Sequence, residues 1–167
     1  MSHYLRKEHI VATRSLVVES GADHDAELLE NIDTRLERAG QRDTRWGVRP
    51  VSLGTWFARP QPWLVIEHRA FPDIRHYIRS RALGAHLELV HISAIEPRWW
   101  KRWGASLARG GRWWSWSMPE DIGGEAELRS WLAVVARSVD AATKEIAERL
   151  GQAPVLGRLE GDVLGWW

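Results

Sequence analysis

The longest regular pattern in the sequence lies in residues 125–150, where apolar residues recur at spacings of four and three. This spacing predicts one long amphipathic helix, whose apolar seam must be covered by other parts of the fold. The seam consists of Leu128, Leu132, Val135, Val139, Ala142, Ile146 and Leu150. Gly123-Gly124 before the pattern and Gly151 after it mark the expected ends of the helix. Because the seam is long for one small core, it could also pair with its counterpart in a homodimer.

A second helix is predicted over residues 24–39. Ser20 or Asp23 can cap its start, and Gly40 suits the position after its last residue. Asp25 and Glu27 place negative charge in the first turn, which the helix dipole favours. The apolar stripe at helical spacing consists of Ala26, Leu29, Ile32, Leu36 and Ala39.

Between residues 46 and 96 the pattern changes to alternation interrupted by turn residues, which indicates strands. Strands are expected over residues 55–58 and 63–68, with a turn at Pro60-Gln-Pro between them. Residues 10–18 suit either a strand or a helix, and we favour a strand from Arg14 to Val18.

A β-hairpin is expected where residues 73–81 and 85–95 flank Leu83-Gly84. If these two residues occupy the centre of the turn, one face of the hairpin is largely apolar and the other carries charge. The expected pairs on one face are Ala82–Ala85, Ser80–Leu87, Ile78–Leu89 and His76–His91, and on the other Arg79–Glu88 and Tyr77–Val90. A helix over residues 72–83 is the alternative, because Pro72 suits the first helical turn.

These elements predict an α+β fold, in which a mostly antiparallel sheet of four or five strands carries both helices on one face. The chain of 167 residues is expected to form a single domain over residues 1–151, followed by a Gly-rich tail over residues 152–167. It contains no cysteine, no secretory signal pattern and no apolar run near the ~20 residues that span a bilayer. We therefore expect a cytoplasmic protein that is soluble or peripheral to a membrane.

Tryptophan is the most unusual part of the composition, with 12 residues in the chain. Half of them lie in residues 98–116, together with several Lys and Arg and no Asp or Glu. A short helix over residues 97–109 would place aromatic residues on one face and basic residues on the other. The apolar face is Trp99, Trp100, Trp103 and Leu107, and a short strand with Trp113, Trp114 and Trp116 follows. The basic residues are Arg98, Lys101, Arg102, Arg109 and Arg112.

Several roles for this segment remain open. Its indole rings could pack on the domain's own sheet, or they could dock a protein partner, since Trp and Arg are enriched at binding hot spots. A basic helix with an aromatic face also suits an anionic membrane surface. Single-stranded nucleic acid fits less well, because the basic set is small. A domain of this size can hardly bury so many indoles, so we expect some to be exposed in the monomer. The terminal Trp166–Trp167 could insert into a partner or another subunit, or the tail could fold back onto its own domain.

Signatures of catalysis are weak. The chain lacks cysteine and a GxSxG motif, and its Gly pairs lack the frame of a phosphate-binding loop. His76 and His91 would be neighbours in the hairpin and, with Glu67 or Glu96, could hold zinc or iron. We therefore expect no catalytic residue and no cofactor.

The sequence favours a non-catalytic interaction module or small subunit that docks a protein partner, or a second copy, through residues 98–116 and the terminal Trp pair. A peripheral membrane protein that uses the helix over residues 97–109 is the alternative. A metal-dependent enzyme with a His76/His91 site is third.

Overall fold

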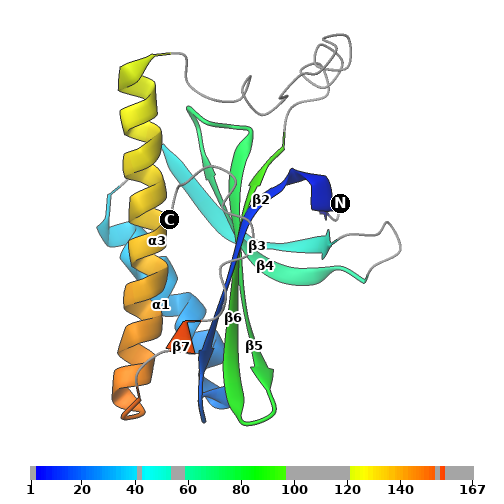
Figure 1. Cartoon of the computed structure of the whole chain (residues 1–167), viewed down its shortest axis with the longest axis vertical. Coiled ribbons are helices and arrows are strands. Elements are labelled where there is room, and N and C mark those ends of the chain that lie inside the picture. Colours follow the sequence, from blue (N-terminus) through cyan, green and yellow to red (C-terminus); the bar gives the residue numbers. More distant parts are fainter. Residues whose placement is uncertain (1–2, 41–42, 54–58, 97–120, 153–154, 157–167) are drawn as a thin grey trace.

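The computed structural model describes residues 3–40, 43–53, 59–96, 121–152 and 155–156 (Figure 1). The helices are α1 (Asp25–Arg38) and α3 (Ile122–Arg149), with short 3-10 turns at η1 (Lys7–His9) and η2 (Ala22–His24). The strands are β1 (His3–Leu5), β2 (Ile10–Val18), β3 (Thr44–Leu53), β4 (Gln61–His68), β5 (Ile74–Leu83), β6 (His86–Ile95) and β7 (Val155–Leu156). The predicted strand over residues 55–58 lies outside the described residues.

All described strands belong to one sheet, in the order β1-β3-β4-β5-β6-β2-β7. Among the strands that the structure describes, only β1 and β3 pair in parallel, and every other pair is antiparallel. The α+β class is confirmed, but the predicted number of four or five strands was too low. The sheet contains six strands and, at one edge, the two-residue β7. The three residues of β1 are too few to show alternation, and β3 contains Gly47 and Pro50, which are uncommon in strands.

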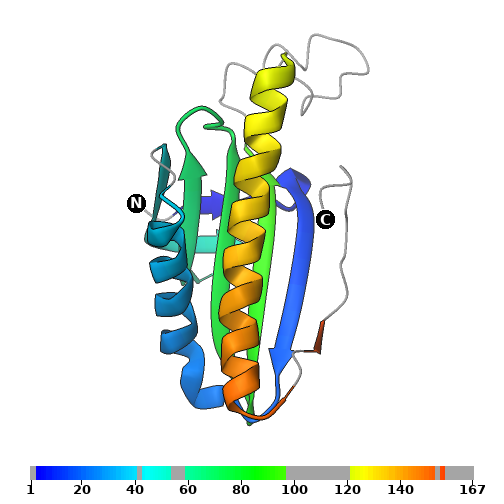
Figure 2. The same cartoon turned by 90° about the vertical axis from the view of Figure 1, so that its left-hand side faces the viewer.

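Both helices lie on the same face of the sheet, with α1 and α3 side by side (Figure 2). Every predicted residue of the α3 seam up to Ile146 is buried, and Leu150 is partly buried against the same core. In α1 the buried residues are Leu28, Ile32 and Leu36, and Leu29 is partly buried against the same core. Ala26 and Ala39 of the predicted stripe are exposed, and Leu28 was missing from it. One apolar core therefore lies between the helices and the sheet, and it contains Trp131.

The beginnings of both helices differ from the prediction. α3 begins at Ile122 because the Oδ1 atom of Asp121 accepts a hydrogen bond from the Gly124 N–H at 2.7 Å, which caps a first turn containing both glycines. α1 follows His24, and neither Ser20 nor Asp23 is its N-cap residue. The ends agree with the prediction, since Gly40 and Gly151 follow the helices with φ of 64° and 70°.

Replacing Asp121 with Ala should destabilise the domain by about 1 kcal/mol, because the first turn of α3 loses its cap. Thermal unfolding of D121A and D121N would measure the loss. Asn also caps helices, so D121N should recover most of the stability, and equal losses in both variants would argue against the cap.

The β5–β6 hairpin confirms the predicted pair of strands, and the helix over residues 72–83 is wrong. The turn is Gly84-Ala85 rather than Leu83-Gly84, so Leu83 faces His86 and Gly84 takes the positive φ of 63°. Each predicted pairing is thus displaced by two residues. A displacement of two keeps every side chain on its predicted face but changes its partner, so Glu88 pairs with Arg81 instead of Arg79.

The face of the sheet opposite the helices carries a second, smaller apolar cluster, which we call the open-face cluster. It consists of Leu5, Val51, Trp63, Val65, Tyr77, Ile92 and Ala94, with Ile10, Leu53 and Val90 partly buried beside it. The sheet curls, so that β1 and β3 turn away from the helices (Figure 1). Charged residues border this cluster and form the site described next.

Candidate anion-binding pocket

Three charged side chains lie in register across β3, β4 and β5 on the open face. Arg45 is paired with Glu67, and Glu67 is paired with Arg75. Directly paired residues share a face of the sheet, and their Cβ atoms lie about 5 Å apart. Two residues away on the same strands stand Val65 and Tyr77 of the open-face cluster. We call Arg45, Glu67 and Arg75 the charged row.

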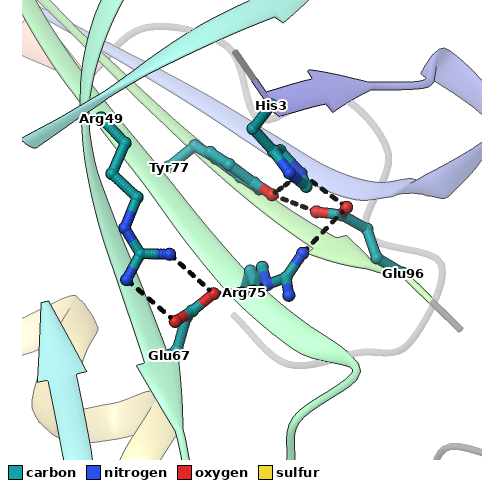
Figure 3. Close-up of polar contacts among 6 residues, drawn as sticks. All are labelled: His3, Arg49, Glu67, Arg75, Tyr77 and Glu96. Atoms are coloured by element: carbon teal, nitrogen blue, oxygen red, sulfur yellow. Dashed lines mark hydrogen bonds and ion pairs between the residues drawn. The ribbon is translucent and has the colours of Figure 1, made fainter. Parts of the chain in front are cut away.

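Arg75 is held between two carboxylates (Figure 3). Its Nε atom lies 2.8 Å from Oε1 of Glu67, and its Nη1 atom lies 3.1 Å from Oε2 of Glu96. Burial opposes the charge of Arg75, but Glu96 and its other neighbours outweigh burial and raise its pKa above the usual value. The guanidinium is therefore charged and fixed in orientation.

Glu96 accepts from three donors, one on β1 and two on β5. His3 Nε2 lies 2.7 Å from its Oε2 atom, Arg75 contacts the same oxygen, and the Tyr77 hydroxyl donates to Oε1 (Figure 3). Burial alone would raise the pKa of Glu96, but His3, Tyr77 and Arg75 together lower it. Burial and the charge of Glu96 raise the pKa of Tyr77 well above its usual value of 10.0. At neutral pH Glu96 is therefore ionised and Tyr77 keeps its proton.

Both carboxylate oxygens of Glu67 also have arginine partners. Arg49 donates from both terminal nitrogens to its two oxygens, each at 3.2 Å, and Arg75 approaches from the other side (Figure 3). Such a fork-to-fork contact fixes both side chains. Neither glutamate therefore has its charge free for a further cation.

A cavity of about 600 Å³ opens beside this network, and we call it the arginine pocket. Its charged lining consists of Arg6, Arg45, Arg69, Arg75, Glu67 and Glu96, which gives a net charge of +2 with histidine neutral. Arg45 and Arg69 are exposed, and in the part of the chain that the structure describes neither has an ion pair. The potential of the pocket is therefore positive, and an oxyanion would find unpaired guanidinium groups there.

The histidine pair proposed as a metal site lies on the opposite, helix-facing side of the sheet. His76 Nδ1 is 3.0 Å from His91 Nε2, so the two are neighbours as predicted, although the register pairs His76 with Ser93. Both rings are buried, and the ring centre of His76 lies 5.0 Å from that of Trp131. Glu67 and Glu96 are on the open face, so neither can be the third ligand. Among the described residues no group of three His, Cys, Asp or Glu is arranged to hold a metal.

The predicted docking residues lie outside the described residues, so their surface remains a prediction. They are Arg98, Trp99, Trp100, Lys101, Arg102, Trp103, Leu107, Arg109, Arg112, Trp113, Trp114, Trp116, Trp166 and Trp167. Of the tryptophans that are described, Trp63 and Trp131 are buried and Trp46 is half-buried. These three rings serve the domain's own packing.

Comparisons with known proteins give no relative from which a role could be transferred. No family model matches the sequence, and no curated protein and no solved structure is significantly similar to it. In the described parts of the chain, neither helix combines the length and the apolar character needed to cross a membrane. The arginine pocket must therefore be interpreted from its own chemistry.

Proposed function

We propose that this chain is a non-catalytic interaction module that binds an anionic group of a protein partner in the arginine pocket. The observation that carries the proposal is the imbalance of charge there. Glu67 and Glu96 are both saturated by internal donors, whereas Arg45 and Arg69 have no carboxylate partner among the described residues. Arginine forks bind carboxylates and phosphates in two-point contacts, so an acidic partner would be recognised by charge and geometry.

The ionisable groups of the network support binding rather than catalysis. A general acid or base works best when its pKa lies near the operating pH. The pKa of Glu96 is lowered and that of Tyr77 is raised, so both are held away from neutrality. Their contacts favour one fixed protonation state, as expected of groups that hold Arg75 in place.

The Trp/Arg-rich segment of residues 98–116 would extend the same interface. Glu96 lines the arginine pocket, and the segment follows two residues later in the chain. Its basic residues would add to the positive charge, and its indole rings would add apolar contacts to a partner or a second copy. The partner expected for this surface is therefore an acidic protein with an exposed apolar patch.

A fluorescein-labelled Asp/Glu-rich peptide should bind the protein, and the double variant R45E/R69E should weaken that binding at least tenfold. The reason is that the two unpaired guanidinium groups become carboxylates beside an already charged network. Fluorescence anisotropy at about 50 mM salt would measure the affinity, which should fall at higher salt as the charges are screened.

The groove between α1 and α3 offers a matched control. Its exposed residues Arg38 and Arg137 also lack an ion pair among the residues described. R38E/R137E makes the same change in net charge on the other side of the sheet, and it should leave peptide affinity within about twofold of wild type. Equal losses in both double variants would mean that net charge alone drives binding, which would contradict the proposal.

Exposure of the tryptophans in residues 98–116 can be tested by quenching of intrinsic fluorescence. The described indoles of Trp63 and Trp131 are buried, so they should resist iodide. We expect a quenchable component that becomes smaller when Trp99, Trp100 and Trp103 are replaced with Phe. Emission that is uniformly blue-shifted and insensitive to iodide would show that these rings are buried and would remove them from the interface.

A further inference from the structure

We propose that the anionic group taken by the arginine pocket is a phosphate monoester carried on a ring-bearing side chain of the partner. This inference rests on the proposed function and specifies its ligand.

The charge of the lining matches a dianion better than a monoanion. Four arginines and two glutamates give a net charge of +2, and both glutamates are hydrogen-bonded to arginine. A phosphate monoester carries about −1.5 to −2 at pH 7 and offers three terminal oxygens. A single carboxylate would leave about one positive charge of the pocket uncompensated.

Arg75 provides a donor that is already oriented. Its Nη1 atom donates to Glu96, its Nε atom lies within ion-pair distance of Glu67 without a well-aligned hydrogen bond, and Nη2 takes part in neither contact. A guanidinium carries five N–H donors in a rigid plane, so fixing one edge and one terminal nitrogen fixes the direction of the others. The side chain is 25% exposed, which leaves it accessible from the cavity. A phosphate there would meet a guanidinium that needs no reordering.

Arg69 lies on a turn that is anchored by its own backbone. The Arg69 N–H donates to the Asp43 carbonyl at 2.8 Å, and the Ala70 N–H donates to Nδ1 of His68 at 3.3 Å. Arg45 lies in the charged row next to Glu67. The two exposed guanidinium groups are thus carried by β3 and by the turn just after β4, and both residues line the same cavity as Arg75.

The volume and the remaining lining indicate that the ligand is larger than phosphate. A cavity of about 600 Å³ is within the range of pockets for whole small molecules. Its uncharged lining consists of ring side chains, namely Tyr4, His9, His68 and Pro72. Rings of this kind pack against a planar group beside the phosphate. A phosphorylated aromatic side chain satisfies both the charge and the space.

Three peptides of one sequence test the inference, carrying phosphotyrosine, glutamate or unmodified tyrosine at the central position. Isothermal titration should give an affinity for the phosphotyrosine peptide at least tenfold above the glutamate peptide, and the tyrosine peptide should bind more weakly still. Phenyl phosphate should compete with the phosphotyrosine peptide, and benzoate should not. R45Q/R69Q should lose at least tenfold in affinity for the phosphotyrosine peptide, whereas R38Q/R137Q should lose less than twofold.

The outcomes separate this inference from the proposed function. If the glutamate peptide binds as tightly as the phosphotyrosine peptide, or benzoate competes as well as phenyl phosphate, the site recognises carboxylate and the inference is wrong, while the anionic docking site stands. If the phosphotyrosine peptide binds equally to wild type and R45Q/R69Q, it binds elsewhere, and the inference is again wrong. If none of the acidic peptides binds to the wild-type protein, both the inference and the proposed function fail.

Discussion

Lowering the pH from 7 to 5 should cost the protein about 4 kcal/mol of unfolding free energy through His76 and His91 alone. Burial lowers the pKa of His76 to about 3, and burial, with the charges of His76 and Arg14, lowers that of His91 well below its usual 6.5. In the unfolded chain both rings take up a proton near pH 6.5, whereas in the folded protein they stay neutral. Above pH 6.5 both rings are neutral in the folded and the unfolded chain, so they cost no stability. As the pH falls below 6.5, protonation favours the unfolded chain, and the free energy of unfolding decreases.

Urea unfolding of wild type and of the double variant H76L/H91L at several pH values would measure this loss. Two core substitutions also change the stability at pH 7, so the quantity compared is the change between pH 7 and pH 5. That change should shrink by about 4 kcal/mol in the double variant. His86→Leu is the control, because His86 is exposed at the hairpin turn, and it should leave the change as in wild type. If the wild-type domain is as stable at pH 5 as at pH 7, the conclusion that His76 and His91 stay neutral in the folded protein is wrong.

Replacing Glu96 with Ala should destabilise the domain by about 3 kcal/mol at pH 7. The substitution removes the carboxylate that accepts from His3, Arg75 and Tyr77, and leaves a half-buried guanidinium and a buried hydroxyl without it. Because contacts lower the pKa of Glu96 in the folded state, its contribution is complete at neutral pH and disappears as the pH falls below about 4. The deficit of E96A should therefore shrink in acid.

Glu88 offers a control on the same open face. It pairs with Arg81, whose side chain is 50% exposed, so E88A should cost no more than about 1 kcal/mol. Denaturant unfolding of both variants gives the comparison. Equal costs for E96A and E88A would mean that the Glu96 network is no stronger than a surface ion pair, and Arg75 would then not be fixed as the pocket requires.

The helices and the faces of the hairpin were predictable because both depend on local periodicity. The α3 seam repeats over many turns, so its buried face could be assigned from spacing alone. The hairpin faces were also right, because a displacement of two residues preserves the alternation of a strand. The register of the hairpin could not be predicted, since either Leu83-Gly84 or Gly84-Ala85 can supply the glycine that such a turn needs.

The arginine pocket could not be predicted in the same way, because its residues meet only through long-range pairing. Arg45 joins Glu67 and Arg75 through the pairing of β3, β4 and β5, and β3 was obscured by Gly47 and Pro50. His3 reaches Glu96 because β1 pairs in parallel with β3 rather than with β2, which follows it in the chain. The one local signal was the abundance of arginine, which by itself does not distinguish a solvated surface from a binding site.

The most direct test of the arginine pocket is a nuclear magnetic resonance titration of the wild-type protein with phenyl phosphate. The largest chemical-shift changes should fall on Arg69, Ala70 and Arg75, including the Nε–H signal of Arg75, and they should disappear in R45Q/R69Q. Changes confined to the α1–α3 groove around Arg38 and Arg137, or unchanged spectra at millimolar phenyl phosphate, would contradict the account.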